Sequence, residues 1–217
     1  MDSIVLYPSY FPSILQMCAV AQAKKVYFEV HDNFQKQTYR NRAYIAHSNG
    51  KLLLNIPILK EKNASRKTAD IKPAYFEDWQ AHHYKSIVSA YNSSPFYEYY
   101  IDDLMEFFEE KPESLLDYNL AIFKRICELI ELDIEVNTTE EFLFEMPENT
   151  LDGRLLIDAK TDFKHEFTPY IQVFQENYSF IQNLSILDLI FNLGPNTLSY
   201  LQAEKIDFKT VLSDKTN

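Results

Sequence analysis

The first 30 residues contain an apolar run, a helical pattern and a second apolar run, and this order constrains the fold more than any other feature. Residues 3–7 (Ser-Ile-Val-Leu-Tyr) and 26–30 (Val-Tyr-Phe-Glu-Val) predict two buried strands. Between them the apolar spacing predicts a helix over about 13–23, with Ser13 as its N-cap. A strand, a helix and a strand within so short a segment predict a βαβ unit with parallel strands and a right-handed crossover.

The βαβ unit also predicts where a ligand binds. In parallel sheets, ligands sit beyond the C-terminal ends of the strands. Here those ends are residues 7–10 and His31-Asp32, so the stretch 31–45 begins where a site is expected. We interpret this stretch as an anion-binding segment, because it places three cations among aromatic and amide side chains: Lys36, Arg40 and Arg42.

A hairpin is predicted directly after this segment. Residues 43–47 and 51–57 alternate in polarity around Asn49-Gly50, a pair typical of type I′ turns, which need two positive φ angles. Arg40 and Arg42 then lie at the base of the first hairpin strand. Since alternate residues of an extended segment share a face, one face is expected to carry Lys36, Thr38, Arg40, Arg42 and Tyr44.

The rest of the chain is mainly helical in pattern. Helices are predicted over 78–91, 96–111, 114–132 and 185–193. Residues 60–73 are interpreted as a surface loop, with a lid over an anionic ligand as the less favoured alternative. The chain ends in a tail (201–217), of which residues 205–217 are expected to fray. The 217 residues therefore predict one α/β domain, with an N-terminal βαβ unit plus a β-hairpin forming a small mixed sheet (1–75), followed by a mainly helical C-terminal half (76–200).

Charge is distributed unevenly along the chain. The net charge of −11 argues against nucleic acid or an anionic membrane as a general partner. Residues 24–85, however, hold twelve of the 21 Lys and Arg and six of the 32 Asp and Glu, which gives +6 there and −17 elsewhere. This contrast favours a small anionic substrate, such as a sugar phosphate or nucleotide sugar. A solvated charged surface is the alternative.

Several common classes of protein are excluded by residue counts. With three glycines, the chain has neither a GxGxxG fingerprint nor a Walker A loop, and it has no HExxH, CxxC or GxSxG motif. Cys18 and Cys127 lie in apolar helical contexts and predict reduced core thiols of a cytoplasmic protein. No apolar run reaches the ~20 residues of a membrane span. The pattern identifies no cofactor.

Four blocks of the chain, in order, resemble the WbqC-like family of bacterial proteins, in the version found in Bacteroides-type bacteria. They span about residues 7–195, most of the chain. The blocks are residues 7–12 (Tyr-Pro-Ser-Tyr-Phe-Pro), Lys36 with Tyr39-Arg40-Asn41-Arg42, Trp79 with His83, Lys85 and Ser86, and residues 184–195. Many members carry a His after the first strand, where this chain has Tyr7.

The resemblance implies a place in surface-polysaccharide biosynthesis, for O-antigen of lipopolysaccharide or for capsule, without fixing a reaction. The first hypothesis is a transferase that binds a nucleotide-linked or phosphorylated sugar, with acyl or aminoacyl transfer to a sugar amine as one form. A nucleotidyltransferase-like enzyme is a weaker form of this hypothesis. The alternative is a non-enzymatic binding or scaffold subunit of a polysaccharide assembly complex, which Tyr7 in place of the His favours.

Under the first hypothesis, each candidate residue has a stated role. The two arginines and Lys36 would hold a phosphate or carboxylate, because a guanidinium can donate two parallel hydrogen bonds. Asn41 would bind a hydroxyl or amide, and aromatic rings would stack on a sugar or base. The candidate binding residues are Lys36, Tyr39, Arg40, Asn41, Arg42, Tyr7, Tyr10, Trp79 and Lys85.

His83 is the first candidate for acid–base catalysis and His31 the second, because the unperturbed pKa of histidine lies near neutrality. A structural role is the alternative for each. No metal site is expected, since the adjacent helical residues His82 and His83 point about 100° apart.

Overall fold

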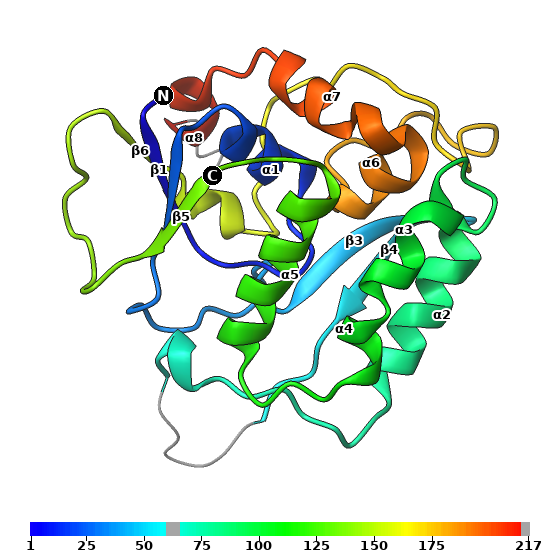
Figure 1. Cartoon of the computed structure of the whole chain (residues 1–217), viewed down its shortest axis with the longest axis horizontal. Coiled ribbons are helices and arrows are strands. Elements are labelled where there is room, and N and C mark those ends of the chain that lie inside the picture. Colours follow the sequence, from blue (N-terminus) through cyan, green and yellow to red (C-terminus); the bar gives the residue numbers. More distant parts are fainter. Residues whose placement is uncertain (60–65, 214–217) are drawn as a thin grey trace.

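The computed structural model describes residues 1–59 and 66–213 and confirms the predicted α/β class, with a parallel sheet, a separate antiparallel hairpin and a mainly helical C-terminal half (Figure 1). The N-terminal βαβ unit is present as predicted. It consists of β1 (Ser3–Leu6), α1 (Ile14–Ala21) and β2 (Lys25–Phe28), and the two strands pair in parallel. The Ser13 hydroxyl accepts a hydrogen bond from the Gln16 N–H and caps α1.

Two further strands complete the parallel sheet, in the order β5-β2-β1-β6. They are β5 (Glu135–Thr138) and β6 (Thr150–Asp152). The sequence did not predict them, because both are short edge strands with side chains that remain partly in solvent; Val136, for example, is 43% exposed. An edge strand of this kind needs no apolar run.

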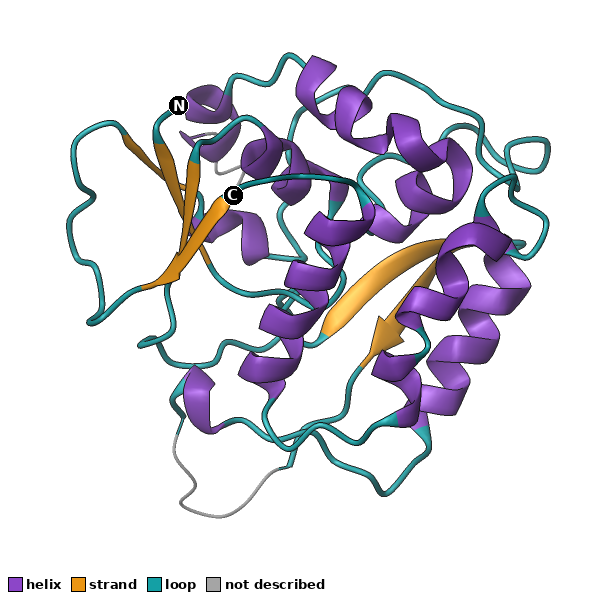
Figure 2. Cartoon of the chain, in the orientation of Figure 1, coloured by secondary structure: helices purple, strands orange, loops and turns teal. Residues whose placement is uncertain are grey.

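The hairpin forms its own two-stranded sheet and does not extend the parallel one (Figure 2). It pairs β3 (Arg42–His47) with β4 (Gly50–Asn55). Gly50 has a φ of +98° and Asn49 a negative φ, so the predicted type I′ turn is wrong although the hairpin is where it was expected. Ala43 and Ile45 on the inner face are buried, and the Ala46 N–H donates to the Tyr91 hydroxyl at 3.2 Å.

The predicted helices over 78–91 and 114–132 are confirmed, with Asp78 and Ser114 as N-caps, and the helical segment 96–111 divides in two. The tail prediction is wrong up to Ser213, because this part forms a helix that buries Phe208 and Val211. The helices after α1 are α2 (Trp79–Tyr91), α3 (Tyr97–Leu104), α4 (Glu106–Glu109), α5 (Leu115–Leu129), α6 (Ile186–Leu193), α7 (Thr197–Ala203) and α8 (Phe208–Ser213).

Helix α5 lies between the parallel sheet and the hairpin (Figure 1). The ring of Phe123 on α5 packs against Phe28 of β2, with centroids 4.8 Å apart. The Asn119 side chain donates to the carbonyl oxygen of Arg40 at 2.7 Å. Helix α5 therefore holds the connection between β2 and β3 in place, and this connection is the segment predicted to bind anions.

The structure describes part of the predicted loop 60–73. Residues 60–65 lie outside the described residues, whereas the Thr68 N–H donates to the Asp32 carbonyl at 2.9 Å and the Thr68 side chain is buried. Cys18 and Cys127 are free and buried, and burial raises the pKa of both thiols. Among the helices of residues 1–59 and 66–213, none has the length and apolar character needed to cross a bilayer.

Candidate functional site

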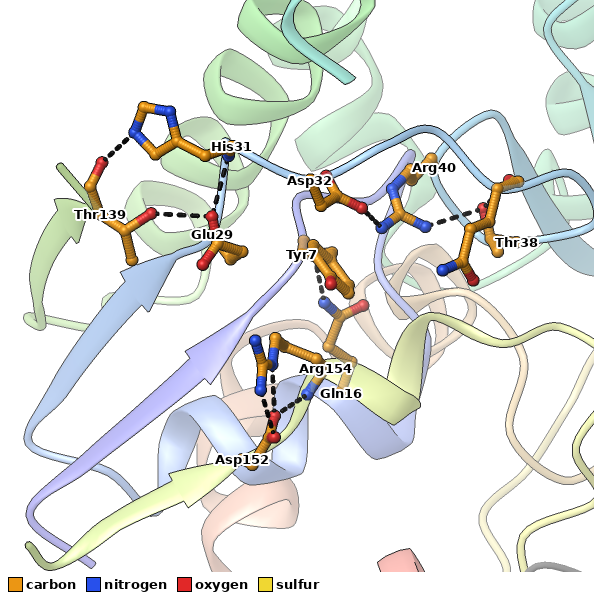
Figure 3. Close-up of polar contacts among 11 residues, drawn as sticks. Tyr7, Gln16, Glu29, His31, Asp32, Thr38, Arg40, Thr139, Asp152 and Arg154 are labelled. Carbon is orange, nitrogen blue, oxygen red and sulfur yellow. Dashed lines mark hydrogen bonds and ion pairs between the residues drawn. The ribbon is translucent and has the colours of Figure 1, made fainter. Parts of the chain in front are cut away.

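The C-terminal ends of β1 and β2 meet at a buried ion pair (Figure 3). The Arg40 Nη2 lies 2.5 Å from Asp32 Oδ2, and the two residues are 0% and 6% exposed. The guanidinium stacks over the Tyr7 ring at 4.0 Å, and its Nη1 donates to the Thr38 hydroxyl at 3.3 Å. Arg40 is therefore part of the core.

The ion pair between Asp32 and Arg40 joins the two ends of the segment between β2 and β3. Burial raises the pKa of Asp32 and lowers the pKa of Arg40, while the charge of each partner acts in the opposite direction. The pair joins the beginning of the segment to its end, so it fixes how residues 41 and 42 leave the sheet edge.

Glu29 and His31 brace the same edge. The Glu29 carboxylate is fully buried and accepts hydrogen bonds from the His31 N–H at 2.8 Å, the Thr139 hydroxyl at 3.1 Å and the Leu143 N–H at 2.8 Å. The Nε2 of His31 lies 2.8 Å from the Thr139 carbonyl oxygen and donates to it. These contacts join the chain after β2 to the chain after β5 (Figure 3). His31 thus has a structural partner on its side chain and on its backbone.

A cleft of about 610 Å³ opens beside Tyr7 at the end of β6, and its arginine is already paired. Arg154 donates two hydrogen bonds to the Asp152 carboxylate, at 2.8 and 2.7 Å, and a third to the Leu143 carbonyl at 2.7 Å. This guanidinium is occupied by the protein, so Lys209 is the other cation among the described residues that line the cleft.

A different cleft, of about 340 Å³, has only basic side chains among the charged residues that the structure describes on its wall, and we call it the basic cleft. These charged residues are Lys36 and Arg42, and no described carboxylate lines the cleft. The Arg42 Nε is buried without a hydrogen-bond partner, and Arg42 forms no ion pair with any described residue. The cleft is lined by Phe34, Lys36, Gln37, Asn41, Arg42, Asn55, Ile56, Pro57, Ile58 and Phe76.

The structure separates the two arginines that the sequence placed on one face. Residues 31–41 contain turns, including Gln37 with a φ of +63°, so the alternation of an extended strand does not hold there. Lys36 is exposed and Arg40 is buried. Arg42 and Tyr44 do share the outer face of β3, because the strand begins at Arg42.

Asn41 is held by the protein on the wall of the basic cleft. Its Nδ2 donates to the Ile56 carbonyl at 2.8 Å and lies 3.4 Å from the Asn55 Oδ1. Sequence reasoning missed Asn55 and Phe76 as lining residues. The register of the hairpin pairs Asn55 with Arg42. Counting along both strands from the Asn-Gly turn could therefore have identified Asn55 as a neighbour of Arg42. No sequence signal marks Phe76, which is 73% exposed.

Tyr10 of the first block and the candidates of the third block lie elsewhere. Tyr10, Trp79 and His83 form an aromatic cluster in the core, and the Tyr10 hydroxyl lies 2.9 Å from the His83 Nδ1. Lys85 is exposed on α2 and lines neither cleft described above. The structure therefore brings together Lys36, Asn41 and Arg42 and leaves the others in separate surroundings.

Because His83 is buried, its protonation is expected to make the stability of the protein depend on pH in the acid range. Burial lowers the pKa of His83 to about 4, from 6.5 for the free side chain. Between these values the unfolded chain binds a proton that the folded chain does not, so the free energy of unfolding falls as pH drops from about 6.5 to about 4, by up to about 3 kcal/mol.

Urea denaturation of the wild type and of His83→Gln at several pH values tests this expectation. The variant should be less stable at pH 7 but lose less stability on acidification. Parallel pH profiles for the two proteins would contradict a neutral, buried His83.

No group of three or more His, Cys, Asp or Glu side chains within the described ranges is placed to hold a metal ion. In comparisons with known proteins, a model of the WbqC-like protein family matches residues 7–169. Searches of curated proteins and of solved structures gave no significant match. The matched range contains the buried Asp32–Arg40 pair and all lining residues of the basic cleft.

Proposed function

The chain belongs to the WbqC-like protein family, and from this premise we propose that it binds a phosphorylated or nucleotide-linked sugar in bacterial surface-polysaccharide biosynthesis, with the phosphate in the basic cleft. Family membership fits a protein connected with polysaccharide biosynthesis in general. One observation carries the proposal about the ligand. In a chain of net charge −11, the described residues that line this cleft include two charged side chains, Lys36 and Arg42, and no acidic one.

The chemistry of Arg42 supports an anionic ligand. A buried guanidinium nitrogen without a partner is costly, and a phosphate oxygen would accept its hydrogen bond. Lys36 adds a second positive charge from the exposed side of the cleft. The negative field of the remaining chain repels large polyanions, so a small phosphorylated molecule is favoured over nucleic acid.

The remaining lining residues support a ligand that also carries a ring. Phe34 and Phe76 offer aromatic surface, and Phe76 is 73% exposed. Gln37 and Asn55 offer amides to hydroxyl groups. A volume of about 340 Å³ accommodates the phosphate end of such a ligand better than an entire nucleotide sugar.

We propose a transferase as the enzymatic form of this function and a binding subunit of an assembly complex as the second candidate. A specific observation favours the second. Among residues 1–59 and 66–213, no His, Cys, Asp, Glu or Tyr side chain lines the basic cleft, so none of the described lining residues is a strong proton acceptor or nucleophile. An enzyme of this kind would take its acid–base group from outside the basic cleft.

Substitution of Arg42 by Ala tests the binding site. We expect the affinity for uridine diphosphate and for inorganic pyrophosphate to fall about 10- to 100-fold, the loss of one or two hydrogen bonds to a charged group. Lys36→Ala should cost less, because its ammonium is exposed and screened by salt. Isothermal titration calorimetry at two salt concentrations measures both effects.

Lys85→Ala is the matched control, since Lys85 is an exposed lysine outside the cleft. It should bind both probes as the wild type does. Wild-type affinity in the Arg42→Ala variant, or no binding of either probe by the wild type, would overturn the proposed function.

A further inference from the structure

A second cleft of about 780 Å³ lies at the other end of the hairpin, and we call it the tyrosine cleft. It is formed between the hairpin, residues 159–167 and residues 182–183. Its volume falls in the usual range for small-molecule sites. Six of its lining residues carry the argument: Tyr39, Tyr44, Lys51, His165, Gln182 and Asn183.

The outer face of the hairpin connects the two clefts. Antiparallel pairing sets Arg42 opposite Asn55 and Tyr44 opposite Leu53, so these four residues share one face. Arg42 and Asn55 line the basic cleft, and Tyr44 lines the tyrosine cleft. Two residues along a strand span about 7 Å, which is comparable with the distance from a sugar phosphate to the far side of its ring.

The tyrosine cleft differs from the basic cleft in charge. Basic and acidic side chains both line it, among them Lys51 and Asp162. The rings of Tyr39 and Tyr44 meet edge to face with centroids 6.2 Å apart, and they give the cleft an aromatic wall. Mixed charge beside aromatic surface suits a neutral, hydroxylated ring better than a phosphate.

Two amide side chains have their orientation fixed by the backbone. The Gln182 Oε1 accepts a hydrogen bond from the Phe167 N–H at 3.0 Å, and the Asn183 Oδ1 accepts one from the Leu15 N–H at 2.9 Å. A backbone N–H can be accepted by the amide oxygen alone, so the assignment of oxygen and nitrogen is firm. Each side chain therefore retains its NH₂ group as a donor for a ligand hydroxyl.

His165 is held by a carboxylate outside the family match. Its Nε2 lies 3.0 Å from the Glu204 Oε2, and Glu204 also accepts from the Thr168 N–H at 2.9 Å. Burial alone would raise the pKa of Glu204, but the hydrogen bonds from His165 and Thr168 hold it below its usual value. With Nε2 donating to a carboxylate, Nδ1 is the ring nitrogen that can accept a hydrogen bond.

From these contacts we propose that the tyrosine cleft is the sugar subsite of the same ligand, with the ring against Tyr39 and Tyr44 and one hydroxyl or amine donating to the His165 Nδ1. The assignment rests on the proposed function, because the phosphate of that ligand occupies the basic cleft. It also supplies what the basic cleft lacks, a proton acceptor beside the ligand. Glu204 is a positioning residue, since it acts through His165.

Nuclear magnetic resonance of the full chain, with its histidines labelled with ¹⁵N, tests the subsite. The probes are hexose 1-phosphates, the corresponding free hexoses, hexosamines and N-acetylhexosamines, and inorganic phosphate. At least one hexose 1-phosphate is expected to shift the His165 ring signals, and inorganic phosphate is expected to leave them unchanged. If no sugar of the panel, phosphorylated or free at high concentration, shifts these signals, the sugar subsite is overturned.

Variants of Tyr44 separate the two proposals. Tyr44→Ala should weaken the responsive hexose 1-phosphate about tenfold and leave the affinity for pyrophosphate unchanged, whereas Tyr44→Phe should retain both affinities because it keeps the ring. Tyr99→Ala is the control, since Tyr99 is 75% exposed on α3. Equal binding of the sugar phosphate by wild type and Tyr44→Ala overturns the subsite but not the proposed function. If the wild type does not bind pyrophosphate while His165 still responds to free sugar, the proposed function is overturned but the sugar subsite is not.

Discussion

Replacing Arg40 by Ala is expected to lower the free energy of unfolding by about 3–5 kcal/mol, the cost of removing one partner of a buried ion pair. Arg40 is 0% exposed, and its removal leaves the Asp32 carboxylate in the core without its cation. The variant also loses the stacking of the guanidinium on Tyr7. Urea denaturation followed by circular dichroism measures the change.

Arg42→Ala is the matched control, two positions along the same chain. Arg42 is partly exposed and has no ion pair among the described residues, so its removal should change stability by about 1 kcal/mol or less while it weakens anion binding. Arg40→Ala should thus act mainly on stability, and Arg42→Ala should act mainly on anion binding.

A double variant tests the cause of the Arg40 effect. Arg40→Met combined with Asp32→Leu removes both charges and keeps apolar bulk, so it should recover most of the stability lost in Arg40→Ala. Equal stability losses in Arg40→Ala and Arg42→Ala would contradict the assignment of Arg40 to the core. A double variant no more stable than Arg40→Ala would show that the stacking and hydrogen bonds of the guanidinium dominate over the uncompensated carboxylate.

The parts of the fold that could be predicted from the sequence are those set by local patterns. The βαβ unit follows from two apolar runs around an apolar helix, and the caps Ser13 and Asp78 follow from side chains that satisfy free N–H groups at helix starts. These patterns act within a few residues of the chain. Strands β5 and β6 have no such pattern, because their pairing with β2 and β1 is decided by distant residues.

The same limit explains the outcome for the site. That residues 31–42 start at the C-terminal end of β2, beside the end of β1, was predictable, because adjacent parallel strands place their C-terminal ends at one edge of the sheet. Which arginine faces outward was not predictable, because it depends on the turn at Gln37 and on the pairing of Arg40 with Asp32. The tyrosine cleft was beyond reach, since His165 and its partner Glu204 are 39 positions apart and both are far from Tyr44.

A buried carboxylate in the C-terminal half shows how residues beyond the family match join the same core. Asp188 on α6 is 0% exposed and accepts hydrogen bonds from three side chains. The donors are the Tyr91 hydroxyl at 2.9 Å, the Tyr170 hydroxyl at 2.5 Å and the Gln172 amide at 2.9 Å. Since Tyr91 lies on α2 and also accepts from the hairpin, Asp188 connects α6 to both.

Asp188→Ala is therefore expected to lower the free energy of unfolding by about 3–5 kcal/mol, because three donors lose their acceptor at about 1–3 kcal/mol each. The loss at Gln172 is at the low end, because its amide keeps its existing hydrogen bond to the Ile181 carbonyl. Tyr170→Phe and Tyr91→Phe remove one donor each and should cost about 1 kcal/mol apiece. The loss for Asp188→Asn should fall between these values, since Asn keeps one acceptor oxygen.

If the chain is one domain, near- and far-ultraviolet circular dichroism of Asp188→Ala will report a single coincident unfolding transition, at a lower urea concentration than in the wild type. Two separated transitions would instead mean that the C-terminal helices unfold independently of the parallel sheet.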